Sequence, residues 1–282
     1  MRDNWQRRLR SKPLVLLDWG YIRALGNDAM HLSNRYNYLV PELALVEACT
    51  AERGSPTRFA HKLLRFLKQN QTRTYLASHL AHMLQAEPKP GVLADRLLIA
   101  HRPFFETEED ANSVNVEGLD ARVKGLGGND HPYTAIQREF EEGRATFAAG
   151  IRENDTGRGI LARQTPEDLG SFIVRPETVT GWVSVFNHRY ESRRWKAALM
   201  VFPDRHAAGR WWRVALWYWL REARGVGPKR LRNDWWDSIY VFTASYCDQF
   251  WTVDQEAAQL VGLLFKETKV VFQSPQGIGA RH

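Results

Sequence analysis

The sequence predicts an α/β fold in which a central parallel sheet carries a large helical insertion. At both ends of the chain, short apolar strands alternate with helical segments, and this order is typical of a parallel sheet. Between the two ends, residues 55 to 232 read mostly as helices. We therefore assign residues 1–75 and 231–282 to the two parts of one sheet domain, and residues 76–230 to a mainly helical insertion.

The N-terminal elements follow the order strand, helix, strand, helix. The apolar run "LVLL" at residues 14–17 is typical of a strand that is buried on both faces, and a segment that can form a helix follows it. Residues 38–40 can form the second strand. Pro41 fits the first position of the next helix, because that position needs no backbone N–H.

The middle region contains segments with helical features. "SPTRFAHKLLRFLKQ" begins with a serine cap and a proline, while "YTAIQREFEEGRATFAAGIRE" and "HAAGRWWRVALWYWLREARG" have the apolar spacing of helices. Residues 106–132, which include "GLGGNDHP", are expected to form a loop.

The C-terminal end returns to alternating elements. We expect a helix over residues 234–247, a strand over 249–253, a second helix over 254–265 and a last strand over 268–274. These strands are predicted to join the N-terminal strands in one sheet.

Composition indicates the compartment and the kind of partner. The two cysteines, Cys49 and Cys247, are too few for a disulfide framework or a four-thiolate zinc site. The longest apolar cluster, "VALWYWL", is far shorter than the roughly 20 residues that span a bilayer. We therefore expect a soluble, cytoplasmic protein with no membrane partner. A net charge of +7 and a pI near 9.5 favour an anionic partner, most simply a nucleic acid.

Acidic residues are predicted to gather at one edge of the sheet. Asp18 and Asp254 each directly follow a predicted strand, and residues in this position meet at the edge of a parallel sheet where ligands bind. Asp234 and Asp237 share a face of one helix, because they are three residues apart. Glu47 lies in the helix after the second strand. Because carboxylates in one crevice repel one another, Mg²⁺ or Mn²⁺ is the natural compensation.

Each acid also has a structural interpretation. Asp18 and Asp254 can cap helices, acids in the first turn of a helix are favoured by its dipole, and Glu47 can form a surface ion pair. Glu42 is the alternative to Glu47 as a ligand. Asp248 precedes its strand, so we expect it at the opposite end of the sheet. The joint placement of the other acids at one edge favours the metal interpretation.

The order and setting of these acids resemble those of the PIN-domain nucleases. "VLLDWG" matches the strand and aspartate near the N-terminus of that family, and "VPELALVEA" matches its helix with a glutamate. The C-terminal block of the family, which ends in Thr-x-Asp, is matched by "NDWWDSIYVFTASYCDQFWTVDQE". The likeness covers roughly the first 50 and the last 50 residues. The resemblance implies a PIN-like three-layer α/β/α fold. It also implies a metal-dependent endoribonuclease whose products carry 5′-phosphate and 3′-hydroxyl ends.

By position, the resemblance assigns the catalytic and metal-binding acids to Asp18, Glu47, Asp237 and Asp254, with Asp234 as an additional or alternative ligand of Mg²⁺ or Mn²⁺. Thr252 is expected to hydrogen-bond a neighbouring carboxylate or the water of the metal.

The segment 205–232 combines basic residues with a dense cluster of tryptophan and tyrosine. Aromatic faces stack on bases and basic groups follow phosphates, so the segment is a candidate for RNA contact. Part of it has the spacing of a buried helix face, and we assign to the core Trp212, Ala215, Leu216, Trp219 and Leu220. The predicted substrate contacts are Arg210, Arg213, Arg221, Lys229, Arg230 and Thr252.

RNA, single-stranded or structured, is the expected substrate, and DNA is the alternative. A toxin, a phage-defence protein and an RNA-maturation enzyme all fit, as do a homo-oligomer and an inhibitory partner protein. The second hypothesis is a non-catalytic nucleic-acid-binding or assembly module on the same fold. The third is a metal-dependent phosphohydrolase of small substrates.

Other chemistries are disfavoured. "GLGGND" lacks the patterns of a P-loop and of a dinucleotide-binding turn. His79 and His82 have no further zinc ligands nearby in the sequence. Gly20 stands where a phosphatase of the haloacid-dehalogenase type needs its second aspartate.

Overall fold

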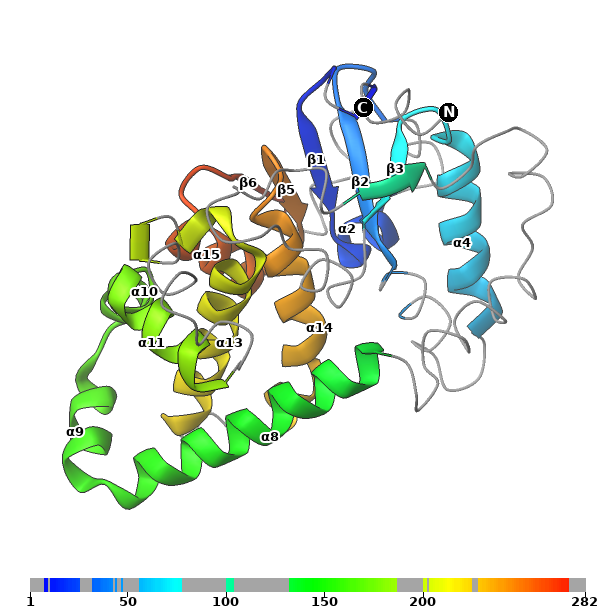
Figure 1. Cartoon of the computed structure of the whole chain (residues 1–282). Helices are drawn as coiled ribbons and strands as arrows, with labels where there is room; N and C mark the ends of the chain where they lie inside the picture. Colours follow the sequence, from blue (N-terminus) through cyan, green and yellow to red (C-terminus); the bar gives the residue numbers. More distant parts are fainter. Residues whose placement is uncertain are drawn as a thin grey trace.

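The chain forms one six-stranded sheet with helices packed around it (Figure 1). A computed structural model of the protein describes residues 8–9, 11–25, 32–42, 44, 47, 56–77, 100–103, 132–186, 200–201, 203–224 and 228–273. The strand order is β4-β3-β2-β1-β5-β6. The strands are β1 (Leu14–Leu17), β2 (Asn37–Pro41), β3 (Thr74–Ala77), β4 (Ala100–Pro103), β5 (Gln249–Thr252) and β6 (Lys269–Phe272).

The prediction of an α/β fold with a parallel sheet is confirmed. β1 pairs in parallel with β2 on one side and with β5 on the other. The pairs β2–β3 and β5–β6 are parallel as well. In Figure 1, β1 (blue) and β5 (orange) lie side by side although they come from opposite ends of the chain. The carboxyl ends of β1 and β5 are therefore neighbours.

Strands β3 and β4 differ from the expected division of the chain. β3 extends the sheet beside β2, and β4 runs antiparallel to β3 at the edge. Part of β3 and the whole of β4 fall within residues 76–230, which we expected to be a helical insertion. Both strands have only four residues, and a segment of that length is too short for periodicity to distinguish a strand from a helix.

The N-terminal elements agree with the sequence except at one boundary. All four residues of β1 are buried, as expected for a strand between two layers. Pro41 ends strand β2 instead of beginning the helix, and it is in register with Ala77 of β3. Helical residues follow it at once from Glu42. The short helix α2 (Trp19–Ala24) directly follows β1.

Most of the residues that the structure describes in the middle region are helical, as predicted. Its helices are α4 (Pro56–Gln69), α8 (Pro132–Glu153), α9 (Asp155–Arg163), α10 (Pro166–Ile173), α11 (Pro176–Phe186), the 3₁₀ helix η4 (Pro203–Arg205) and α13 (Ala207–Ala223). The predicted loop lies largely outside the described residues. No helix in the described ranges has the length and apolar composition needed to cross a membrane.

Helix α13 is the centre of the helical region, and it contacts α8, α10, α11 and α14. The five residues that we assigned to the core from their spacing are all buried, which confirms that assignment. The long helix α8 lies against α13, where the indole Nε1 of Trp219 donates a hydrogen bond to the carbonyl oxygen of Phe140 at 3.2 Å.

The C-terminal elements follow the predicted order. They are α14 (Pro228–Ala244), strand β5, α15 (Gln255–Leu264) and strand β6. Helix α14 begins earlier than predicted, at a proline, which is favoured in the first turn of a helix. This helix carries Asp234 and Asp237, and α15 begins directly after Asp254.

Candidate functional site

Asp18 is held at the carboxyl end of β1 by two hydrogen bonds. Its Oδ1 accepts from the backbone N–H of Gly20 at 2.9 Å and caps helix α2, as the structural interpretation predicted. Its Oδ2 accepts from the hydroxyl of Thr252 at 2.7 Å. A Cβ on Gly20 would lie 3.1 Å from Oδ2 of Asp18, so the missing side chain leaves room for this carboxylate.

Thr252 connects two of the predicted acids. Its hydroxyl donates to Asp18 and accepts from the backbone N–H of Asp254 at 2.9 Å, which confirms the predicted hydrogen bond to a neighbouring carboxylate. Asp254 in turn caps α15, because its Oδ1 accepts from the N–H of Ala257 at 2.8 Å. Thr252 is fully buried, so its hydroxyl fixes the ends of β1 and β5 relative to each other.

Glu47 is held by a residue that the sequence did not single out. The phenolic hydroxyl of Tyr240 donates to Oε2 of Glu47 at 2.6 Å. Tyr240 lies on α14 three residues after Asp237 and is buried. Its spacing from Asp237 was visible in the sequence, but a tyrosine in such an aromatic helix is first assigned to the core.

The predicted acids act on one another electrostatically. Burial raises the pKa of Asp237 to about 8, and the negative charges of Asp254, Glu47 and Asp18 contribute in that order. Burial likewise raises the pKa of Glu47 to about 7; the Tyr240 hydrogen bond opposes the shift and the charge of Asp18 adds to it. The pKa of Asp18 is also raised, mainly by burial, with Asp254 adding to the shift. The structure therefore places these four acids close enough for their charges to act on one another.

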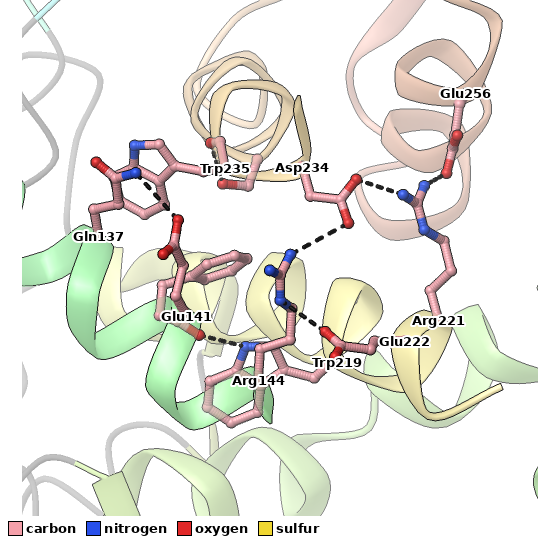
Figure 2. A network of polar contacts seen from close by, with 11 residues as sticks. Gln137, Glu141, Arg144, Trp219, Arg221, Glu222, Asp234, Trp235 and Glu256 are labelled. Carbon is pink, nitrogen blue, oxygen red and sulfur yellow. Dashed lines mark hydrogen bonds and ion pairs between the residues drawn. The ribbon is translucent and has the colours of Figure 1, made fainter. Parts of the chain in front are cut away.

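Asp234 is paired with arginines, although its negative charge also adds to the raised pKa of Asp237. Its carboxylate pairs with Arg221, and its Oδ2 lies 3.5 Å from Nη1 of Arg144 (Figure 2). The side chain is only 1% exposed. The carboxylate of Asp234 is thus occupied by two arginines, and we leave it out of the metal-binding set.

The arginines predicted to bind substrate are bonded within the protein. Arg210 donates to the carbonyl oxygens of Asp204 and Ser245 and lies over the ring of Tyr246. Arg213 is buried; it pairs with Asp204 and donates to the carbonyl of Val174 at 2.9 Å. Both side chains are therefore engaged within the protein, and their contact with a substrate stays a prediction.

Other predicted residues have separate outcomes. Arg221 pairs with Asp234 and Glu256, so it too is engaged internally. Asp248 accepts from the N–H of Leu14 at 2.7 Å, which confirms that it lies at the amino ends of the strands. The side chains of Lys229 and Arg230, as well as His79, His82, Cys49 and "GLGGND", lie outside the described residues.

The chemistry of the donors fits a hard divalent cation. Asp18, Glu47, Asp237 and Asp254 offer carboxylate oxygens, which Mg²⁺ and Mn²⁺ prefer, and mutual repulsion disfavours their joint ionisation. Among the side chains that the structure describes, no group of three or more His, Cys, Asp or Glu is close enough to enclose an ion as it stands.

Comparisons with protein-family models, curated proteins and solved structures found no match to this chain.

Proposed function

We propose that the protein is a metal-dependent nuclease that hydrolyses phosphodiester bonds, with RNA as its substrate. The observation that carries this proposal is that Asp18 and Asp254 follow the neighbouring strands β1 and β5, and that the charges of both, together with that of Glu47, act on the buried Asp237. Ligands bind at this edge of open α/β sheets. The resemblance of the surrounding motifs to PIN-domain nucleases supports the same interpretation.

The four carboxylates are the residues that would hold Mg²⁺ or Mn²⁺. Such an ion supplies an acidified water and stabilises the negative charge that develops on a phosphodiester. The fixed members of the set are Asp18 and Asp254, whose oxygens accept from backbone N–H groups at the start of α2 and α15. Asp237 and Glu47 have raised pKa values of about 8 and about 7, so without a cation both hold a proton for part of the time near neutral pH.

The charge balance of the protein favours a polyanionic substrate. A net charge of +7 attracts nucleic acid without specifying its sequence. Arg23 is an exposed residue of α2 whose positive charge lowers the pKa of Glu47, so it is the basic side chain that we place beside the acids. RNA is our first choice and DNA the alternative.

The test is cleavage of end-labelled single-stranded RNA and DNA by the purified protein with EDTA, Mg²⁺ or Mn²⁺. We expect Asp237→Asn to lower cleavage by roughly a thousandfold. Asp248→Asn is the matched control, because it removes one negative charge at the opposite end of the sheet and keeps an acceptor for Leu14. If Asp237→Asn cleaves as well as Asp248→Asn, the nuclease proposal is wrong. Metal-independent RNA binding without cleavage would then favour a binding module.

A further inference from the structure

A network of ion pairs joins the helical region to the two helices that carry Asp237 and Asp254. Nε of Arg144 on α8 lies 2.8 Å from Oε2 of Glu222 on α13, and its Nη1 lies 3.5 Å from Oδ2 of Asp234 on α14. Arg221 on α13 pairs with Asp234 and with Glu256 on α15. Figure 2 shows the carboxylate of Asp234 between the two guanidinium groups.

The centre of the network is shielded from water, while Glu256 at one end is 43% exposed. The side chains of Arg144 and Arg221 are 14% and 13% exposed, and that of Asp234 is 1% exposed. Burial raises the pKa of Asp234, and the charges of Arg221 and Arg144 act in the opposite direction. Because a buried carboxylate is costly without its partners, the pairs fix the distance between the helices that carry them.

Two acids of the network, Asp234 at its centre and Glu256 at one end, are close in sequence to acids of the proposed site. Asp234 is three residues before Asp237, about one turn earlier on α14. Glu256 is two residues after Asp254, in the first turn of α15. One side chain, Arg221, thus holds the start of α15 and the first half of α14 together. Its guanidinium also lies over the ring of Tyr218, 5.3 Å from the centroid, which restricts it further.

We propose that Arg221 and Arg144 are positioning residues for the site: they set the spacing between Asp237 and Asp254 and thereby its affinity for a divalent cation. This inference rests on the proposed function. It gives the helical region a defined part in the activity, because α8 and α13 supply both arginines while the acids themselves lie on the sheet domain. We call the pairs that Arg221 and Arg144 form with Asp234 and Glu256 the arginine clamp. Asp234 is the carboxylate that both arginines share.

The test compares Arg221→Gln with Arg224→Gln. Arg224 is three residues after Arg221, at the end of α13, and is exposed, so its variant loses the same charge close to the same place. Calorimetry measures Mn²⁺ affinity, cleavage measures the Mg²⁺ concentration for half-maximal rate, and unfolding without metal measures stability. We expect roughly tenfold weaker Mn²⁺ binding for Arg221→Gln, partial recovery for Arg221→Lys, and wild-type binding for Arg224→Gln.

A double-mutant cycle with Arg144→Gln and Asp234→Asn keeps the inference open to refutation if Arg221→Gln does not fold. The two effects on Mn²⁺ affinity should be non-additive, since both variants break the same pair. Lower stability with unchanged Mn²⁺ affinity would show a merely structural role and overturn the inference.

Failure of the proposed function gives a different result. If the wild type binds no Mn²⁺, the proposal of a metal site is wrong. Hydrogen exchange then tests separately whether the arginines hold α14 and α15 together. The arginine clamp predicts faster exchange in α14 and α15 of Arg221→Gln, with α4 unchanged as an internal reference. Equal exchange in all three helices would refute the arginine clamp as well.

Discussion

The phenolic oxygen of Tyr240 lies 2.6 Å from Oε2 of Glu47 and donates a hydrogen bond to it. This contact joins α14 to the acidic residue that follows β2, and it leaves Glu47 with one oxygen not used by Tyr240. The hydrogen bond favours the ionised form of Glu47, against the effect of burial. Tyr240 therefore favours the form of Glu47 that the proposed cation requires.

We expect Tyr240→Phe to weaken Mn²⁺ binding by roughly tenfold, because loss of the donor raises the pKa of Glu47 further and a proton then competes with the metal. The fold should persist, since phenylalanine keeps the ring. Calorimetric titration with Mn²⁺ measures the effect. Tyr38→Phe is the control, because the hydroxyl of Tyr38 donates to the carbonyl oxygen of Ser33 at 3.1 Å. Equal Mn²⁺ affinity in the two variants would contradict the role of Tyr240.

Substitutions of Thr252 test the hydrogen bonds that connect the carboxyl ends of β1 and β5. Thr252→Val keeps the shape but removes the donor to Asp18 and the acceptor for Asp254, so we expect a loss of about 1–3 kcal/mol in unfolding free energy together with weaker Mn²⁺ binding. Thr252→Ser should retain both properties. Urea denaturation and Mn²⁺ titration check the pair.

The control for Thr252 is Thr243→Val. Thr243 is also buried, but its hydroxyl donates to the carbonyl oxygen of Ile239 in its own helix. Its variant should change stability and leave Mn²⁺ affinity at the wild-type value. Identical metal affinity for Thr252→Val and Thr252→Ser would show that the hydroxyl has no part in the site.

Local sequence patterns predicted the parts of the site that depend on strand ends. Asp18 and Asp254 follow apolar runs, and in a parallel sheet such positions lie at one edge and come close when their strands are neighbours, as β1 and β5 are. Tyr240 could not be assigned in this way, because its partner Glu47 is far away in the sequence. The contact depends on how α14 crosses the sheet, and helical spacing does not specify that crossing.

The arginines of α13 have partners that the sequence did not indicate. We predicted Arg213 and Arg221 as substrate contacts, because basic groups follow the phosphates of a nucleic acid. Their partners, Asp204 and Asp234, become neighbours only when η4 and α14 pack against α13. Helix-period analysis identified the aromatic core of α13 correctly, but it could not show that the arginines beside that core pair with acids of other elements.

Gly143 tests the contact between α8 and α13. A Cβ at this position would lie 2.5 Å from Cζ2 of Trp219, so alanine must push the two helices apart. We expect Gly143→Ala to lower the unfolding free energy by about 1–3 kcal/mol in urea denaturation. Gly150→Ala on the same helix meets nothing within 4 Å and should be neutral or stabilising by up to about 1 kcal/mol. The same sign of change in both variants would refute the close approach.

The raised pKa values predict an unusual dependence of stability on pH. The pKa values of Asp237 and Glu47 are about 8 and about 7 in the folded protein, against 3.8 and 4.5 ordinarily. The folded state therefore holds more protons than the unfolded chain, so stability must fall as pH rises from about 5 to about 8. A tenfold change in proton affinity corresponds to about 1.4 kcal/mol, so the loss of stability is on the order of a few kcal/mol.

A divalent cation should reverse this loss, because it replaces the protons as the partner of the carboxylates. We expect Mn²⁺ to raise the unfolding midpoint more at pH 8 than at pH 5, and to release protons on binding near pH 7. Calorimetry in buffers of different ionisation enthalpy measures the release. Asp237→Asn removes the most strongly shifted acid, so its metal-free form should be more stable than the wild type at pH 8 and gain less from Mn²⁺. A metal-free wild type that gains stability between pH 5 and pH 8 would contradict the buried acidic cluster.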